Sequence, residues 1–326
     1  LLIIMEKYKL VIILNFILRL PLLFLVPVAM FGDGLARFIP RSYQAARLNF
    51  FFPENPLFFI FEGFWILIFS GGLLEFFWKL TPFLFFTATL FLLPEIYKIL
   101  NMEKREKIIV SALFLFYVWY FLSSENIMIE SMLIFFTLAL FIIIERTQEG
   151  ETKKYWLILF ITAILFYTKQ TTYFMIPGFF IYVFFKKTSA KNKLRIMISM
   201  FIGAILYVPW LLKNYFWAVP DPLHSVDDFI LVPLITFFQE GSLTLVIMRL
   251  NSAFHTFWFI PSFSQVNFNG IYSIAFIIFY FSFLLSAFII SLTIMAGIIV
   301  FRKKYKNYLL LMSILFVFVF IWGILC

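Results

Sequence analysis

Long apolar runs recur along the whole chain, and short charged segments separate them. A run of about 18 or more apolar residues is long enough for a helix to cross the hydrocarbon core of a bilayer. Hydrophobic residues make up 63% of the 326 residues, whereas charged residues make up only 13%. Because so few polar groups could not cover the surface of a water-soluble protein of this size, the sequence predicts an integral membrane protein.

The predicted fold is all-α: a polytopic transmembrane helix bundle of about nine or more spans. We treat residues 1–326 as a single transmembrane domain. The chain begins with LLII ahead of Met5 and stops at Cys326 inside an apolar run. We therefore expect a fragment of a longer protein, cut at least at its C-terminus. The expected spans are Tyr8–Met30, Leu73–Leu100, Ile108–Leu122, Ile127–Ile144, Trp156–Phe166, Phe174–Phe185, Ile196–Leu212, Ile271–Phe301 and a last one from Tyr308 onward.

Lysine and arginine are concentrated in alternate loops. Three to five lysines or arginines stand in each of the segments NMEKREK (101–107), ERTQEGETKKY (145–155), KKTSAKNKLR (186–195) and RKKYKN (302–307). If the N-terminus is cytoplasmic, 18 of the 26 lysines and arginines face the cytoplasm and 7 face outside. The positive-inside rule then predicts a multi-pass protein of the cell membrane with a cytoplasmic N-terminus. This bias also accounts for the net charge of +9, so membrane lipids are expected partners and nucleic acid is not.

A polar island follows the first span. The stretch Phe31–Leu48 reads FGDGLARFIPRSYQAARL, and it opens the first predicted outer loop, residues 32–70. We expect Asp33–Leu48 to form a short amphipathic helix that Pro40 kinks or divides, because proline lacks the N–H donor that an interior turn needs.

The rest of this first outer loop is apolar but contains polar residues. Phe50–Phe69 opens with PENP and carries Glu54 and Glu62, so we expect a helix that lies in the membrane interface or dips into it. The second predicted outer loop covers residues 213–270. Outer loops and outer span ends hold most of the acidic residues, which places the expected chemistry on the outer face.

Several classes of site are excluded by the motifs. The chain has no P-loop, no Rossmann glycine pattern and no H-E-x-x-H sequence. It contains one cysteine and two histidines, too few for a disulfide framework or a cysteine–histidine metal site. An enzyme at the outer face, without cytoplasmic nucleotide, would take an activated group from a lipid carrier.

Several motifs follow one another in a recognisable order. Arg19 lies near the end of the first span, Asp33 follows it, and then come RSYQAARL and PENPL. Further along stand IESMLIFFTLALF, FYTKQTTYFMIPG, KNY with PDP, and FHTFWFIPSF. In this order the motifs resemble the membrane glycosyltransferases of the GT-C type, which include protein O-mannosyltransferases and the lipid A aminoarabinose transferase. The resemblance covers roughly residues 10 to 300.

The resemblance implies an enzyme that moves a sugar from a polyprenyl-phosphate carrier to a protein, lipid or glycan acceptor, with inversion at the anomeric carbon. In that family the first outer loop carries an acidic residue, often as an Asp-Glu pair. This chain has Asp33 at the first position and Gly34 at the second, a departure from the two-carboxylate pattern. No cofactor besides the lipid-linked donor is predicted. Metal use stays open, since Asp33 and Glu54 could share a divalent ion.

The chemistry of such a transfer assigns a role to several polar residues. A carboxylate can take the acceptor's proton, which makes Asp33 the candidate catalytic base. Cations can stabilise the departing phosphate, a role open to Arg37, Arg41 and Lys169. Each residue also has a structural interpretation: Asp33 as a helix N-cap, the arginines as contacts for lipid headgroups, and Lys169 as a lysine that extends to the membrane boundary.

The remaining candidates bind substrate. Tyr43, Glu130 and His255 complete the predicted set, and Glu130 resembles the family's second acidic position. Glu130 could instead be a helix-start carboxylate favoured by the helix dipole, and His255 an ordinary hydrogen-bonded loop histidine. We expect Asp33, Glu130 and Lys169 to line one outer cavity.

Two other functions remain open. In a transporter or lipid or oligosaccharide flippase, Arg19, Glu130 and Lys169 would line a pathway, and charges near the middle of the membrane would be expected. In a non-catalytic assembly subunit, Asp33 and Lys169 would share no cavity. The positions of the polar residues distinguish these functions.

Overall fold

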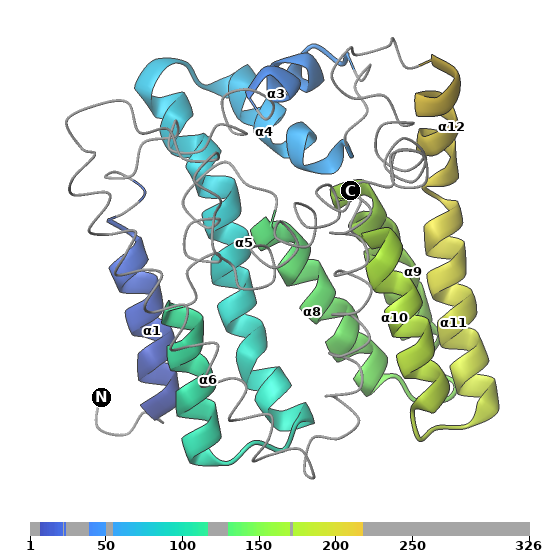
Figure 1. Ribbon diagram of the computed structural model, residues 1–326. Coiled ribbons are helices and arrows are strands. Elements are labelled where there is room, and N and C mark those ends of the chain that lie inside the picture. The colour runs from blue at the N-terminus through green and yellow to red at the C-terminus, as the bar shows by residue number, and fades with distance from the viewer. Residues whose placement is uncertain are drawn as a thin grey trace, which may run out of the picture. The chain divides into compact units, whose positions relative to one another are not determined.

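Every regular element in the described part of the chain is an α-helix. The computed structural model describes residues 7–21, 23, 39–49, 55–116, 130–169 and 172–217. The helices are α1 (Lys7–Arg19), α3 (Ile39–Ala46), α4 (Leu57–Ile68), α5 (Gly71–Ile99), α6 (Lys104–Phe116), α8 (Glu130–Arg146), α9 (Thr152–Thr168), α10 (Thr172–Phe185), α11 (Ala190–Ile205) and α12 (Val208–Trp217) (Figure 1).

Two helical stretches are long and apolar enough to cross a membrane. They are Phe76–Ile99 and Ala190–Lys213, each 24 residues long. At 1.5 Å per residue such a stretch extends roughly 36 Å, more than the thickness of the hydrocarbon core. The all-α fold class is thus confirmed for the described residues, and two of the expected spans meet the length test. The larger number of spans stays a prediction.

Two of the expected spans are interrupted. The first was expected to run to Met30, but α1 ends at Arg19, two residues before Pro21. The seventh, expected over Ile196–Leu212, lies within the helical stretch Ala190–Lys213, and a turn at residues 206–207 separates α11 from α12 just before Pro209. A proline accounts for each turn, because Pro21 and Pro209 lack the N–H donor that a continuous helix would need at their positions.

Proline has the opposite effect at the start of α3. We expected Pro40 to kink or divide a helix from Asp33 to Leu48. Instead α3 begins at Ile39 and Pro40 is its second residue, where no intrahelical bond is lost because the first N–H groups of a helix have no partner within it. Residues 33–38 of the expected helix lie outside the described part.

The start of the second expected outer loop also differs from the prediction. Residues 213–217 belong to α12, which ends at Trp217, so the helix continues past Lys213 through an aromatic segment. The rest of the loop to residue 270, and the expected spans from Ile271 and Tyr308, lie outside the described residues.

The described residues fall into two compact units. Unit 1 contains α1, α3, α5, α6, the part of α4 from Phe58 onward and α8 as far as Leu138. Unit 2 contains the segment 48–57, the rest of α8, and α9 to α12.

Unit 1 has a polar junction between three apolar helices. α1 packs against α6, and Asn15 Nδ2 of α1 donates to the backbone oxygen of Ser111 at 3.3 Å. The Ser111 hydroxyl lies 2.6 Å from the Tyr97 hydroxyl of α5. Phe16 and Phe83 pack beside this junction, with ring centroids 5.6 Å apart. These hydrogen bonds satisfy buried polar groups that would otherwise destabilise the packing.

Unit 2 is built on the contact between α9 and α11, and α10 packs against both helices. Figure 1 shows these three helices side by side, with α12 continuing from the end of α11. A glycine allows the closest approach: a Cβ added at Gly203 would lie 2.5 Å from the backbone oxygen of Leu159 and 2.9 Å from Thr162 Cβ. Small residues permit this kind of backbone contact between apolar helices.

Candidate functional site

Two polar clusters lie at opposite ends of α9 in unit 2. We call the one at its C-terminal end the tyrosine end; it consists of Asn55, Tyr167, Lys169, Tyr173 and Tyr207. The basic end lies at the N-terminal end of α9 and centres on Glu145, Tyr155, Lys186 and Asn192. Since the helices between them are apolar, each cluster is a local concentration of hydrogen-bonding groups.

A chain of hydrogen bonds organises the tyrosine end. The Tyr173 hydroxyl donates to the Tyr207 hydroxyl at 2.9 Å, and the Tyr207 hydroxyl donates to Asn55 Oδ1 at 2.8 Å. The amide nitrogen of Asn55 donates in turn to the backbone oxygen of Phe166. Asn55 and Tyr207 are buried. The chain therefore holds the segment around Asn55 against the C-terminal end of α9.

Aromatic packing supports these hydrogen bonds. Tyr207 lies in the turn between α11 and α12, and its ring centroid is 5.1 Å from that of Tyr167, in an edge-on arrangement. The ring of Phe166 lies 5.8 Å from Tyr207 and 5.6 Å from Tyr173. Pairs at these distances add to the stabilisation from burial alone.

Lys169 ends α9 beside these tyrosines. Its backbone is extended, and its N–H donates to the backbone oxygen of Leu165 at 3.3 Å. The start of α10 is tied to the end of α9, because the Thr172 hydroxyl also donates to the backbone oxygen of Leu165, at 2.9 Å. Lys169 itself is half-buried. The backbone of Lys169 is thus fixed at the end of α9, between Tyr167 and Tyr173 in the chain.

The tyrosine end joins two motifs that are more than 100 residues apart in the chain. Asn55 comes from PENPL, and Tyr167, Lys169 and Tyr173 come from FYTKQTTYFMIPG. Sequence reasoning noticed both motifs but did not place them together. It missed Tyr207 altogether, because a tyrosine within an apolar run carries no signal of a partner 152 residues away. The following Pro209 was the available sign of a break there.

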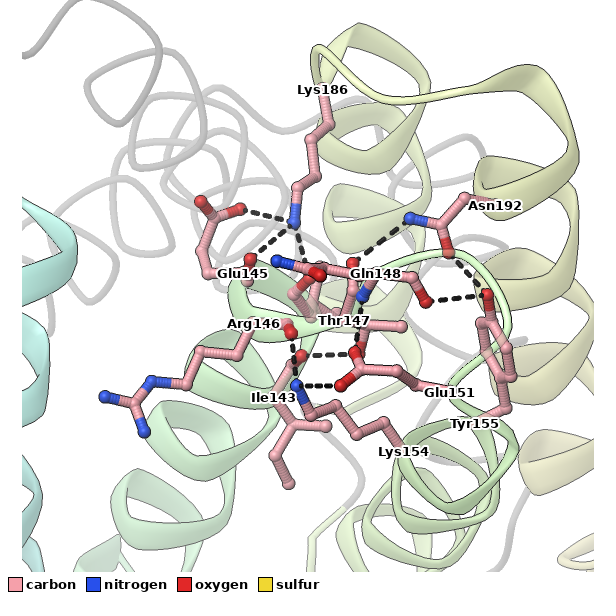
Figure 2. A network of polar contacts seen from close by, with 11 residues as sticks. Ile143, Glu145, Arg146, Thr147, Gln148, Glu151, Lys154, Tyr155, Lys186 and Asn192 are labelled. Atoms are coloured by element: carbon pink, nitrogen blue, oxygen red, sulfur yellow. Dashed lines mark hydrogen bonds and ion pairs between the residues drawn. The ribbon is translucent and has the colours of Figure 1, made fainter.

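The basic end is an ion-pair cluster (Figure 2). Lys186 Nζ lies 3.2 Å from Glu145 Oε1, and it also donates to the backbone oxygens of Ile144 at 2.5 Å and Glu145 at 3.0 Å. The Tyr182 hydroxyl donates to the same Glu145 oxygen at 2.8 Å. Burial lowers the pKa of Lys186, and the charge of Glu145 opposes that shift. Lys186 therefore joins the C-terminal end of α8, whose carbonyls favour a cation, to α10.

Asn192 extends this cluster to α9 and α11. Its amide nitrogen donates to the backbone oxygen of Thr147 at 3.1 Å, and its Oδ1 accepts from the Tyr155 hydroxyl at 2.6 Å. Ser189 caps α11 by accepting from the backbone N–H of Asn192 at 3.2 Å. These bonds hold the loops at this end in place. Figure 2 shows the side chains of Asn192 and Tyr155 pointing toward each other.

Among the described residues of unit 1, the side chains of Arg19 and Glu62 are ionisable and fully buried in apolar helices. Arg19 of α1 is 0% exposed, and its guanidinium carbon lies 4.1 Å from the centre of the Phe86 ring. Glu62 of α4 is also 0% exposed. We expected Glu62 to mark an interfacial helix. Within the described residues it is a core position, on the face of α4 that also buries Phe58 and Phe59.

The predicted site residues are only partly described. Arg41 and Tyr43 lie in α3 of unit 1, where Arg41 Nη1 donates to Gln44 Oε1 at 3.1 Å and Tyr43 packs edge-on against Trp78 at 6.0 Å. Glu130 is the first residue of α8, and Lys169 belongs to the tyrosine end. The following lie outside the described residues: Asp33, Arg37, Glu54, His255 and the side chain of Glu130.

The predicted outer cavity therefore stays a prediction. Among the described residues, no group of three or more histidines, cysteines or carboxylates is placed to hold a metal ion. Asp33 and Glu54 are not among those residues, so metal use stays open as well. The chain matches no protein-family model, no curated protein and no solved structure.

Proposed function

We propose that the chain is a polytopic membrane glycosyltransferase. It would transfer a sugar from a polyprenyl-phosphate carrier to an acceptor at the outer face of the cell membrane, with inversion. The observation that carries the proposal is the tyrosine end, where Asn55 of PENPL bonds to the backbone oxygen of Phe166 in FYTKQTTYFMIPG and, through Tyr207, to Tyr173 of the same motif. Both motifs belong to the ordered set that resembles the GT-C enzymes, and the lysine and arginine bias predicts that this end faces outside.

The physical chemistry of the tyrosine end suits a lipid-linked phosphate. Lys169 is a cation beside an apolar bundle, where its charge favours an anionic partner. The neighbouring Tyr173, Tyr207 and Asn55 already bond to one another, so they can hold the backbone around Lys169 without competing for the phosphate. Preorganised cations of this kind stabilise a departing phosphate without reorganising during the reaction.

The other predicted residues take the roles that the resemblance implies. Asp33 acts as the general base on the acceptor. The resemblance gives Arg37 and Arg41 the role of binding phosphate, since a guanidinium can bind two phosphate oxygens at once. Tyr43, Glu130 and His255 contact the sugar or the acceptor.

A transfer assay with purified protein in detergent tests the proposal. Wild-type protein is incubated with radiolabelled polyprenyl-phosphate sugars and with protein, lipid and glycan acceptors. We expect product from at least one donor, with loss of about 10²-fold or more in rate for Asp33→Asn, which removes the base. Lys169→Met should cost about 10²-fold as well, because it removes a cation from the departing phosphate.

Lys153→Met is the matched control for Lys169→Met. Lys153 also lies on α9, but at the other end and exposed, so its removal should leave the rate unchanged. Full activity in Asp33→Asn would reject the base assignment. No transfer from any lipid-linked sugar by correctly folded wild-type protein would reject the glycosyltransferase proposal itself.

One observation favours the alternative, a transporter or flippase. Arg19 and Glu62 are completely buried in apolar helices of unit 1. Charged groups at such positions are expensive and commonly mark a pathway for an ion or a polar substrate. Reconstitution in liposomes separates the two functions: a transporter would move a lipid-linked oligosaccharide or a polar solute across the bilayer, whereas a transferase would form product without net movement.

A further inference from the structure

Glu62 is a buried carboxyl with no compensating partner among the described residues. It is the one charged residue of α4, whose sequence is LFFIFEGFWILI. Neither carboxyl oxygen has a hydrogen-bond partner of acceptable geometry, although both are shielded from solvent. Buried carboxylates are normally paired with a cation or several donors. The surroundings of Glu62 therefore decide which form of the carboxyl is present.

The α3 side of Glu62 is closed by contact between backbones. A Cβ added at the next residue, Gly63, would lie 2.9 Å from the backbone nitrogen of Ala46 and 3.0 Å from the backbone oxygen of Ser42. The backbones of α3 and α4 are therefore in close contact at the residue next to Glu62. The charged residues of α3 are engaged elsewhere or exposed: Arg41 bonds to Gln44, and the following Arg47 is exposed.

The α5 side is closed by an aromatic pair. The Trp65 ring stacks on Phe77 with centroids 4.9 Å apart, and its indole N–H donates to the Thr81 hydroxyl oxygen at 2.7 Å. Thr81 is the polar neighbour of the Glu62 carboxyl, but it does not reach hydrogen-bond geometry with it. Lys79 of the same helix is buried and has contacts of its own. No cation of the described residues acts on Glu62.

We propose that Glu62 is a proton-binding site: at neutral pH the carboxyl is held as the neutral acid between α3, α4 and α5. An ionised carboxylate here would lose its hydration and gain no counter-charge, so the carboxyl takes up a proton instead. The inference is independent of the proposed transferase activity. It assigns Glu62 a ligand, the proton, and a reactivity that exposed or paired carboxylates lack.

That reactivity is toward hydrophobic carbodiimides. The protonated carboxyl adds across one C=N bond: its oxygen bonds to the central carbon of the carbodiimide, and its proton passes to a carbodiimide nitrogen. The resulting O-acylisourea contains all atoms of both reactants. Transfer of the acyl group from oxygen to nitrogen then gives a stable N-acylurea, with no other reactant. An ionised carboxylate lacks the proton that the first step requires.

The test is labelling of the full chain in detergent micelles with dicyclohexylcarbodiimide at pH 7, followed by intact-mass and peptide mass spectrometry. We expect one principal adduct, on Glu62. Its rate of formation should fall about tenfold per pH unit once the pH exceeds the value at which Glu62 releases its proton. A water-soluble carbodiimide should fail to label Glu62, because the site excludes water.

Two glutamine variants complete the experiment. Glu62→Gln should lose the adduct while keeping its helical circular dichroism, since a neutral amide replaces a neutral acid of the same shape. Glu95→Gln, which alters a carboxylate paired with Lys98 at 2.9 Å, should keep the adduct. Absence of a Glu62 adduct at pH 7, its persistence across alkaline pH, or equal labelling by the water-soluble reagent would each overturn the proposal. If Glu62→Gln does not fold, peptide mapping of the wild-type adduct decides the question.

Discussion

The basic end of unit 2 and the surroundings of Glu62 in unit 1 both shield a carboxyl from water, and they do so in opposite ways. Glu145 is 14% exposed and meets Lys186, itself 13% exposed, at 3.2 Å, with the Tyr182 hydroxyl at 2.8 Å on the same oxygen. Glu62 is 0% exposed, and Thr81 is its polar neighbour among the described residues. The first carboxyl has a partner of opposite charge, whereas the absence of one favours a proton on the second.

This difference separates a structural carboxylate from a candidate functional one. Lys186 and Glu145 compensate each other, and their bonds tie α8 to α10 at the basic end. A glutamate at position 62 contributes no comparable bond in the described structure, although leucine or phenylalanine would pack there without a polar group. Since buried polar groups without partners are destabilising, a role in function is the simplest physical reason for its presence.

The largest expected effect comes from removing the partner of Glu145. Lys186→Met should lower the free energy of unfolding by about 3 kcal/mol, because it leaves a shielded carboxylate without its cation and removes the donor to Ile144 O. The measurement is equilibrium unfolding in mixed micelles. The same variant should make Glu145 reactive toward dicyclohexylcarbodiimide, as Glu62 is expected to be.

Lys98→Met is the control for Lys186→Met. Lys98 pairs with Glu95 at a similar distance, but its side chain is 68% exposed, so its loss should cost less than about 0.5 kcal/mol. Equal effects of the two substitutions would show that the basic end is not a structural ion-pair cluster, and the contrast with Glu62 would then fail.

The next effect concerns the close backbone contacts of the two units. Gly203→Ala should destabilise unit 2 by about 2 kcal/mol, and Gly63→Ala should destabilise unit 1 by a similar or smaller amount, because each added methyl meets backbone atoms at under 3 Å. Gly63→Ala should also admit solvent beside Glu62 and allow the water-soluble carbodiimide to label it. Thermal unfolding and the labelling assay report the two effects separately.

Gly150→Ala is the comparison for both glycine variants. A Cβ at Gly150 meets nothing within 4 Å, but the backbone has a φ of +90°. Strain of the left-handed backbone alone should cost roughly 1 kcal/mol. A cost for Gly203→Ala no greater than this would argue against close packing of α9 on α11.

A smaller effect is expected from the second partner of Glu145. Tyr182→Phe removes the hydroxyl that donates to Glu145 Oε1 and keeps the ring that packs against Phe141. It should lower the free energy of unfolding by about 1.5 kcal/mol, the typical value for a hydrogen bond to a charged group. Because Lys186 remains, Tyr182→Phe should leave Glu145 unreactive toward carbodiimide, and labelling of Glu145 in this variant would contradict the assignment of Lys186 as its main partner.

The smallest effect is a change with pH in the exposed loop between α8 and α9. The Ser189 hydroxyl holds the pKa of Glu149 below its ordinary value of 4.5, and the backbone N–H of Gln148 does the same for Glu151. A lowered pKa means that these bonds stabilise the fold fully above pH 4.5 and that this contribution is lost as the pH falls below it.

Amide hydrogen exchange measures this change. Residues 147–152 should become less protected below pH 4.5, after correction for intrinsic rates, while the core of α9 stays protected. Glu149→Gln together with Glu151→Gln should show the lower protection at every pH. Unchanged protection across the acid range would mean that the two carboxylates do not order the loop.

Much of the helical architecture could be predicted from the sequence. The apolar runs predicted α5 and α8 to α10 within a few residues, because hydrophobic length and charged interruptions are local properties. The positions at which helices are interrupted were harder to predict. Pro209 follows the turn that ends α11, whereas Pro82 and Pro94 lie inside α5, where the surrounding helices support the interruption. The same residue type therefore divides one helix and leaves another intact.

The candidate site was less accessible to sequence reasoning. PENPL and FYTKQTTYFMIPG were recognised as polar motifs, but nothing in either one indicates that Asn55 bonds to Tyr207. Glu62 was noticed as a polar residue and assigned to the membrane interface. The sequence alone does not distinguish a glutamate at the membrane boundary from one that is buried in the protein. Its burial depends on α3 and α5, which pack against it from elsewhere in the chain.

Composition and local pattern are enough to specify an α-helical chain with segments able to cross a membrane, and to predict which loops are basic. These properties follow from the transfer of apolar residues out of water and from hydrogen bonds within each helix, neither of which needs a distant partner. The pairing of Glu145 with Lys186, the joining of Asn55 to Tyr207 and the isolation of Glu62 are different. Each depends on which side chains from separate helices lie within about 3 Å of one another, and only the packed tertiary structure decides that.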